Sequence, residues 1–392
     1  MFGGIRVLEL GTWVMVPAAA TVLADFGAEV IKVEHPRVGD PGRGMRGAGA
    51  TDVNVSVEQV NRGKRSVGLD LSRPEAREVL YALAARADVF MTSFLPRARR
   101  RLGFEVEDLR AHNPALIYVR GSSVGIEGDE VDKPGFDFTV FWARSGFQSA
   151  VTNGSGVSRP VGPRPGFGDK TSAMNIAFGV AAALFHRERT GEPSVVDVSL
   201  LSSALWSNSS DVAYSQSAGA DFAAHPMPRQ PPSGAFGTAD GRFVFFNFHD
   251  ATQWPALCAA IGRPELADDP RFADPAARRD NAEACTAELD ATFGTATLDH
   301  WRARLAPLKV AWEAVQTPFE VADDPQVVAN GYVAEVTHPG GRTIRMVRPP
   351  VQFDGRRPEL GRAPGIGQHT DEVLTELGLG DRIDRWRADG VI

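Results

Sequence analysis

Apolar strands alternate with helical segments in the first 120 residues, and this alternation constrains the fold more than any other feature. The run Ile5–Leu10 precedes a helix that Pro17 opens and Gly27 ends, and a second apolar run follows at 28–34. Such a strand–helix–strand unit predicts parallel strands, because the helix carries the chain back to start the next strand in the same direction. Further strands are expected at 66–71, 88–91 and 116–120, with a helix at 74–87. The sequence therefore predicts an α/β fold with a Rossmann-like parallel sheet.

This unit lacks the glycine fingerprint of a dinucleotide site. Gly11 is followed by Trp13 and Val14 rather than by further glycines, although Glu34 stands where a ribose-binding acid would be. We therefore expect neither a nicotinamide nor a flavin cofactor.

Composition argues against several other classes of protein. The net charge of −7 argues against nucleic acid as a partner. Two cysteines, Cys258 and Cys285, give neither a disulfide framework nor a metal spacing, and the eight histidines include no pair at metal-ligand spacing. No apolar run is long enough to span a membrane, and no signal peptide is visible at the start. The expectations are a cytoplasmic enzyme with no metal and no membrane association.

A second informative stretch is 164–191. Its first five residues contain Pro165, Gly166 and Gly168 and predict a loop, and a helix is expected from Lys170 with a buried stripe of mostly small residues. Asp169 stands at this junction. It is either an N-cap, or a nucleophile that the helix dipole keeps ionised and that glycines leave accessible. The local pattern does not choose between the two.

The order of motifs along the whole chain favours the nucleophile. The chain resembles the class III CoA-transferases of the CaiB/BaiF type, the family that also contains formyl-CoA transferase and α-methylacyl-CoA racemase. The resemblance runs nearly end to end. It is carried by VLELGTWVMVPAAATVLADFGAEVIKVEHPRVGD (7–40), NRGKRSVGLDL (61–71), ADVFMTSFLPRARRRLGF (87–104), GDKTSAMNIAFGVAAALFHRERTG (168–191) and GIGQHTDEVLTELG (365–378).

The resemblance implies a role for particular residues. Asp169 occupies the position of the family's nucleophile, and Gly168 and the helix start are expected to offer N–H groups to the oxyanions. Coenzyme A is implied as substrate and product. Its expected contacts are Thr12, Trp13, Val14, His35, Arg37, Lys64, Arg65, Ser93, Phe94, Arg101 and Lys133.

The segment 132–147 separates two branches of the family. In the racemase branch a proton-shuttling His precedes the Asp of this motif, whereas here that residue is Phe136, which cannot carry a proton. Asp137 is either an auxiliary carboxylate or a helix cap. The side chains of Trp13, Met15, Phe136 and Trp142 favour an apolar or aromatic acyl pocket.

The resemblance also implies the organisation of the chain. The expected segments are a large CoA-binding domain (1–200), a linker that reads as a long crossing segment (201–235), a small α+β domain (236–330), a return linker (331–355) and a C-terminal segment that completes the large domain (356–392). An interlocked homodimer is expected.

The predicted function is transfer of CoA between carboxylic acids through an aspartyl anhydride and an aspartyl-CoA thioester on Asp169. The alternatives are a racemase or epimerase of the same fold, a hydrolase in which water replaces the acceptor acid, and a non-catalytic acyl-CoA-binding relative.

Overall fold

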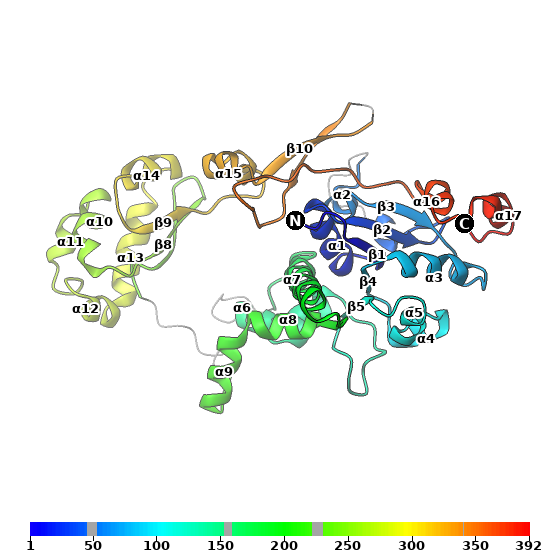
Figure 1. Cartoon of the computed structure of the whole chain (residues 1–392). Coiled ribbons are helices and arrows are strands. Elements are labelled where there is room, and N and C mark those ends of the chain that lie inside the picture. Colours follow the sequence, from blue (N-terminus) through cyan, green and yellow to red (C-terminus); the bar gives the residue numbers. More distant parts are fainter. Residues whose placement is uncertain (45–52, 153–158, 222–229, 340) are drawn as a thin grey trace. The chain divides into compact units, whose positions relative to one another are not determined.

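The computed structural model describes residues 1–44, 53–152, 159–221, 230–339 and 341–392. Its contacts divide the chain into two compact units (Figure 1). Unit 1 comprises Met1–His225 and Val328–Ile392, and unit 2 comprises Pro226–Val327. The five segment boundaries given above stay a prediction, and residues 222–229 of the expected linker lie outside the described residues.

Unit 1 is built on a six-stranded parallel sheet with the order β3-β2-β1-β4-β5-β6. The strands are β1 (Arg6–Leu10), β2 (Glu29–Glu34), β3 (Arg65–Gly68), β4 (Val89–Thr92), β5 (Ile117–Ser122) and β6 (Val195–Ser199). The chain moves outward from β1 to β3 and then returns to the other side of β1 to form β4. The strand order therefore reverses between β1 and β4, as in Rossmann-like folds, and the predicted fold class is confirmed.

Helices cover both faces of this sheet because its strands are apolar on both sides. One face buries Val7, Val89 and Val119 against helices α1, α7 and α8. The other buries Leu8, Phe90 and Tyr118 against α3, α5, α16 and α17. The helices of unit 1 up to residue 221 are α1 (Met15–Asp25), η1 (Pro41–Gly44), α2 (Val55–Asn61), α3 (Ala76–Arg86), α4 (Pro96–Leu102), α5 (Val106–Arg110), η2 (Asp137–Arg144), α6 (Phe147–Thr152), α7 (Phe167–Thr190), α8 (Leu200–Ser207) and α9 (Ser209–Ala218).

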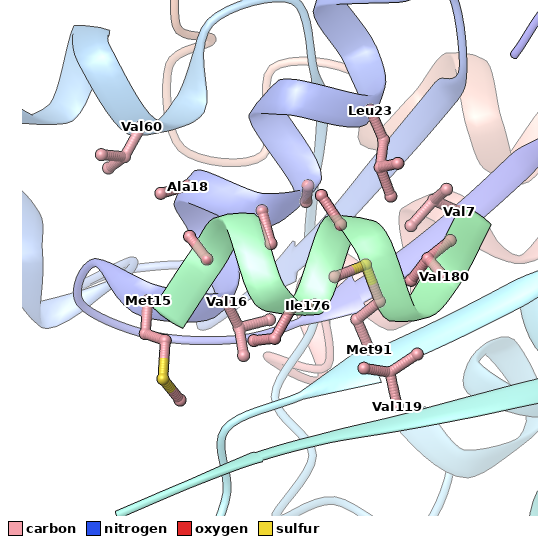
Figure 2. Packing of buried hydrophobic residues seen from close by; sticks show 14 of the residues in the cluster. Val7, Met15, Val16, Ala18, Leu23, Val60, Met91, Val119, Ile176 and Val180 are labelled. Atoms are coloured by element: carbon pink, nitrogen blue, oxygen red, sulfur yellow. The ribbon is translucent and has the colours of Figure 1, made fainter. Parts of the chain in front are cut away.

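Small side chains let α1 and α7 approach each other closely. The predicted stripe of α7 is buried at Ala173, Ile176, Ala177 and Val180, and it faces Ala18, Ala19 and Ala20 of α1 within one apolar cluster (Figure 2). This pairing anchors α7, whose first turn carries Asp169, to the sheet.

The rest of unit 1 lies near the C-terminus. It contains an antiparallel hairpin of β10 (Val333–Thr337) and β11 (Thr343–Val347), followed by α16 (Thr370–Glu376), η6 (Gly380–Arg382) and α17 (Ile383–Ala388). Helix α15 (Pro325–Asn330) spans the division between the units.

Unit 2 has its own apolar core of Phe236, Phe246, Trp254, Phe293 and Trp301. Its antiparallel sheet has the order β7 (Gly234–Gly237), β8 (Phe243–Asn247) and β9 (Ala311–Ala314). Its helices are η4 (Ala251–Gln253), α10 (Trp254–Ala260), α11 (Glu265–Asp268), α12 (Pro275–Asp280), α13 (Ala282–Phe293), α14 (Leu298–Leu305) and η5 (Glu320–Asp323).

Two expectations about elements are wrong. Residues 200–218 are not an extended crossing segment but the helices α8 and α9, and Ser199 caps the first by accepting from the N–H of Ser202 at 2.9 Å. Helix α7 begins at Phe167, three residues before the predicted start, because Gly166 takes the left-handed conformation (φ 72°) that ends the loop. No helix in the described ranges has the length and apolar character that crossing a bilayer requires.

Candidate active site

A cavity of about 590 Å³ lies at the carboxyl ends of the parallel strands in unit 1. Its lining includes Leu10 at the end of β1, Glu34 at the end of β2, Ser93 after β4 and Ser122 at the end of β5, together with Asp169. The strand order reverses between β1 and β4, which is where ligands bind in open α/β sheets.

Asp169 is the third residue of α7, which excludes the alternative that it is the N-cap of this helix. The cap comes from another segment. Asp137, at the start of the π-helix η2, accepts the backbone N–H of Gly168 at 3.1 Å. Of the two predicted roles of Asp137, the structure therefore shows helix capping, but of α7 rather than of its own helix.

Gly168 is tightly enclosed. A Cβ atom at this position would lie 2.2 Å from Cγ of Phe141 and 2.5 Å from Oδ1 of Asp137. The expectation that its N–H is offered to an oxyanion is wrong, because that N–H already donates to Asp137. Glycine is needed here for the close approach of η2 to α7.

The two carboxylates influence each other. Burial and the nearby charge of Asp137 raise the pKa of Asp169 to about 7. Burial also raises the pKa of Asp137, although hydrogen bonds from the backbone of α7 oppose this shift. The helix dipole favours the ionised form of Asp169, whereas burial and the charge of Asp137 oppose its ionisation. Asp169 is a carboxyl group poised between its two protonation states.

Six of the expected CoA contacts line the same cavity as Asp169. They come from three separate loops and one helix of unit 1: Thr12, Trp13, His35, Ser93, Phe94 and Arg101. The N–H of Thr12 donates to Oγ of Ser93 at 2.9 Å and ties the loop after β1 to the loop after β4.

Lys64 and Arg65 lie elsewhere, and we remove them from the candidate CoA contacts. The Lys64 ammonium is fully buried and donates to Glu9 (2.6 Å) and to three further oxygens between 2.8 and 3.1 Å. Arg65 forms ion pairs with Glu29, Glu372 and Glu376. Neither side chain lines the cavity.

The remaining three expected contacts are also outside the cavity lining. Val14 follows Trp13 but points toward the α7 start, 3.6 Å from where a Cβ of Gly166 would be. Lys133 is exposed and pairs with Glu130, although its neighbours Pro134 and Gly135 do line the cavity. Arg37 is exposed in the turn after β2.

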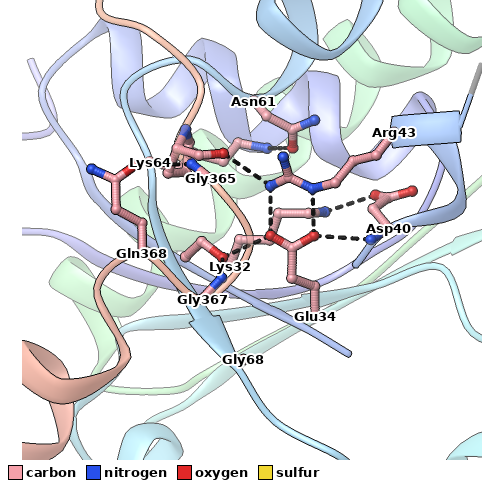
Figure 3. Close-up of polar contacts among 12 residues, drawn as sticks. Lys32, Glu34, Asp40, Arg43, Asn61, Lys64, Gly68, Gly365, Gly367 and Gln368 are labelled. Carbon is pink, nitrogen blue, oxygen red and sulfur yellow. Dashed lines mark hydrogen bonds and ion pairs between the residues drawn. The ribbon is translucent and has the colours of Figure 1, made fainter. Parts of the chain in front are cut away.

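A buried charge network next to the cavity did not follow from the sequence motifs, and Figure 3 shows its Lys32–Asp40 pair. Lys32 of β2 pairs with Glu9 of β1 at 2.8 Å and with Asp40 at 2.9 Å, and its ammonium also donates to the carbonyl of Gly11. Asp40 in turn accepts the N–H of Trp13 at 3.0 Å. Lys32 and Glu9 are adjacent in the sheet register, and a charged pair inside two apolar strands is the signal that could have revealed the network.

Comparison with known proteins identifies the family. Residues 2–370 match the family model described as CoA-transferase family III. The chain belongs to CoA-transferase family III. This CoA-transferase is 30% identical to (R)-2-hydroxy-4-methylpentanoate CoA-transferase of Clostridioides difficile over 99% of this chain and 98% of that protein.

Two further comparisons agree. Succinyl-CoA:mesaconate CoA-transferase of Haloarcula hispanica is 33% identical over 98% of both chains. The crystal structure of a CaiB/BaiF family protein from Brucella suis superposes with a TM-score of 0.85 at 28% identity, covering 96% of this chain and 99% of that one. The family predicted from the sequence motifs is confirmed, and so is CoA-transferase activity.

Proposed function

We propose that Asp169 carries CoA between carboxylic acids as a covalent intermediate. Its carboxylate attacks the thioester carbonyl of an acyl-CoA, and the C–S bond breaks to give an aspartyl–acyl anhydride and CoA thiolate. The thiolate attacks the aspartyl carbonyl and releases the first acid, leaving an aspartyl-CoA thioester. The acceptor carboxylate then reverses these two steps and leaves as the new acyl-CoA.

One observation carries this proposal: Asp169 shares a single cavity with six side chains that the family resemblance assigns to CoA. Free carboxylates attack thioesters poorly in water, so the site must hold the reacting atoms close together. Orientation of this kind can contribute about 7–11 kcal/mol to lowering the barrier. CoA held by its nucleotide end would keep its thiolate beside the anhydride.

Asp137 supports the nucleophile in this scheme. It holds the first turn of α7 through Gly168, and its charge contributes to the raised pKa of Asp169. The chemistry uses CoA as a substrate and calls for no metal, nicotinamide or flavin.

The names of the relatives point to more than one class of acid as acyl donor and acceptor. The names of the relatives include a branched apolar hydroxy acid as well as the dicarboxylates succinate and mesaconate. Phe136 disfavours racemisation, because no protonatable group stands at the position where the racemase branch carries its His.

We also infer an interlocked homodimer. Large apolar side chains protrude from α7 and α8 of the single chain: Phe178 is 77% exposed, Phe185 65% and Trp206 79%. Apolar groups of this size are normally covered by a partner when several occur together. The cytoplasmic location stays a prediction from the sequence.

The proposal is tested by trapping the intermediate. The enzyme is incubated with a panel of acyl-CoAs, treated with hydroxylamine or borohydride, digested and analysed by peptide mass spectrometry. We expect the modification left by the trapping reagent (the label) on the peptide that contains Asp169. We expect Asp169→Asn to abolish both the label and CoA transfer. Asp384→Asn is the matched control, because it removes an exposed acid from the first turn of another helix in unit 1.

Four results would contradict covalent transfer through Asp169. Transfer by Asp169→Asn at the parent rate would exclude covalent catalysis at this residue. Exchange of an α-deuteron without acyl transfer would indicate a racemase, and release of free acid without an acceptor would indicate a hydrolase. Absence of transfer and of label in the parent enzyme, with CoA affinity retained in both the parent and Asp169→Ala, would indicate a non-catalytic binder.

A further inference from the structure

Trp13 has the least expected backbone conformation near the cavity. Its φ angle is 67°, in the left-handed region that bulky residues rarely adopt. Apart from glycines, only one other described residue, Asp354, has a positive φ. Strain of this kind persists where the surrounding structure enforces it, and it gathers at binding and catalytic sites.

The buried charge network enforces this conformation. Oδ1 of Asp40 accepts the N–H of Trp13 at 3.0 Å and the N–H of Gly42 at 2.8 Å. The carboxylate is fixed by Lys32 (Figure 3). The Lys32 ammonium also donates to the carbonyl of Gly11 at 2.9 Å. Hydrogen bonds to Asp40 and Lys32 therefore hold the loop after β1 on both sides of Thr12.

The strained backbone directs the Trp13 ring into the cavity. The ring meets Phe136 edge to face, with centroids 5.7 Å apart, and both rings line the cavity that contains Asp169. They remain exposed in the chain, Trp13 to 36% and Phe136 to 51%. The pair lies at the Asp169 end, because Phe136 directly precedes Asp137, which bonds to Gly168.

Charge near this aromatic pair is negative. Asp169 lines the cavity together with the two rings, and the only arginine of the described lining, Arg101 on α4, comes from an element assigned to CoA. A second carboxylate on the acyl group would therefore meet an acid and an apolar wall, at a cost in free energy. An aromatic acyl group would instead gain ring contacts at this wall.

We propose that Trp13 and Phe136 form the acyl subsite and select an aromatic or bulky apolar acyl group over a dicarboxylate. This inference rests on the proposed transfer through Asp169 and names its substrate class. Asp40 and Lys32 are positioning residues of this subsite, because they act on the acyl group only through Trp13.

The test compares two exchange reactions in the full-length enzyme. Labelled 3-phenylpropionate is exchanged into 3-phenylpropionyl-CoA, and labelled succinate into succinyl-CoA. We expect kcat/KM to favour the aromatic pair by at least about 10-fold. Trp13→Gly, in which glycine accepts the positive φ without strain, and Phe136→Ala should each lower the aromatic value about 10- to 100-fold and leave the succinyl value within about 3-fold.

The control is Phe138→Ala, which removes a half-exposed ring from the same segment outside the cavity lining and should change neither value appreciably. A preference for succinyl-CoA, or equal losses with both substrates in Trp13→Gly and Phe136→Ala, would overturn the subsite while leaving transfer through Asp169 intact. Absence of exchange with either acid, together with an unlabelled Asp169, would overturn the proposed function and the subsite with it.

Discussion

Asp137 has two effects on the start of α7 that pull in opposite directions. By accepting the N–H of Gly168 it fixes the turn that carries Asp169, and by its charge it opposes ionisation of the same residue. A nucleophilic carboxylate must be ionised, yet a less stable anion is also a better nucleophile toward a thioester carbonyl. Asp137 therefore makes the anion of Asp169 more reactive, and it lowers the fraction of Asp169 that is ionised at low pH.

This arrangement predicts the pH dependence of covalent loading. Asp169 attacks as the anion, and its pKa is raised to about 7. The loading rate should therefore rise about tenfold per pH unit below pH 7 and level off above it. Rapid-quench measurement of the labelled Asp169 peptide between pH 5 and 9 checks the midpoint, with buffers of constant ionic strength.

Asp137→Asn separates the two effects. The amide oxygen can still accept from Gly168, while the like charge next to Asp169 is removed, so the midpoint should move to lower pH. A midpoint that stays at about 7 in this variant would show that burial alone sets the pKa of Asp169.

At the residue scale, sequence reasoning found the residues near the reacting centre but not all of their partners. Asp169, Thr12, Ser93 and Arg101 follow from motifs, and the structure brings them to one cavity. Lys64 was expected to contact CoA from the family resemblance, and its buried partner could not be read from the local sequence. Its partner Glu9 lies 55 positions away, and only the pairing of distant strands buries the two together.

Packing between elements determines where Asp169 lies. Helix α7 is 24 residues long and packs against the alanines of α1. Its position relative to the sheet therefore depends on how closely the two helices approach each other. Small residues on both helices keep this distance short, and interiors packed at this density resist added volume.

Enlarging one of these alanines should disturb the fold more than the same change at an exposed alanine of another helix. Ala177 is buried between the helices, whereas Ala85 of α3 is exposed. We expect Ala177→Leu to lower the free energy of unfolding by about 1–3 kcal/mol, because the interior has no room for the added carbons. Ala85→Leu should change it by less than about 0.5 kcal/mol. Urea unfolding followed by circular dichroism measures both, and equal effects would contradict tight α1–α7 packing.

Element types were largely predictable because the strands are continuous apolar runs and the helices have clear apolar periodicity. The failures lie where periodicity is weak. The α8 and α9 segments are rich in Ser and Ala, which favoured a loop in the sequence analysis, and the helix caps at Ser199 outweigh that composition. The start of α7 was misplaced because its cap, Asp137, is 30 residues upstream of Phe167 and invisible to local rules.

At the scale of the whole chain, unit 2 is inserted into unit 1. The chain leaves unit 1 after His225 and re-enters it at Val328, and the returning segment is bonded to the edge strand β3. His369 accepts the N–H of Ser66 at 3.1 Å, and Thr370 accepts the N–H of Gly68 at 2.9 Å. Both ends of the insertion are therefore continuous with the same unit.

In the interlocked homodimer proposed above, the subunits cannot exchange without unfolding. We therefore expect that tagged and untagged dimers, mixed under native conditions, form no hybrids over days, because the returning segment must first detach from β3. Denaturing the mixture in urea and refolding it should give hybrids in statistical proportion. Affinity capture on the tag followed by intact-mass measurement distinguishes the two cases. A dimer that merely buried Phe178 and Trp206 at a surface contact would form hybrids natively at a rate set by its dissociation, and a chain that remained monomeric would leave those side chains exposed in solution.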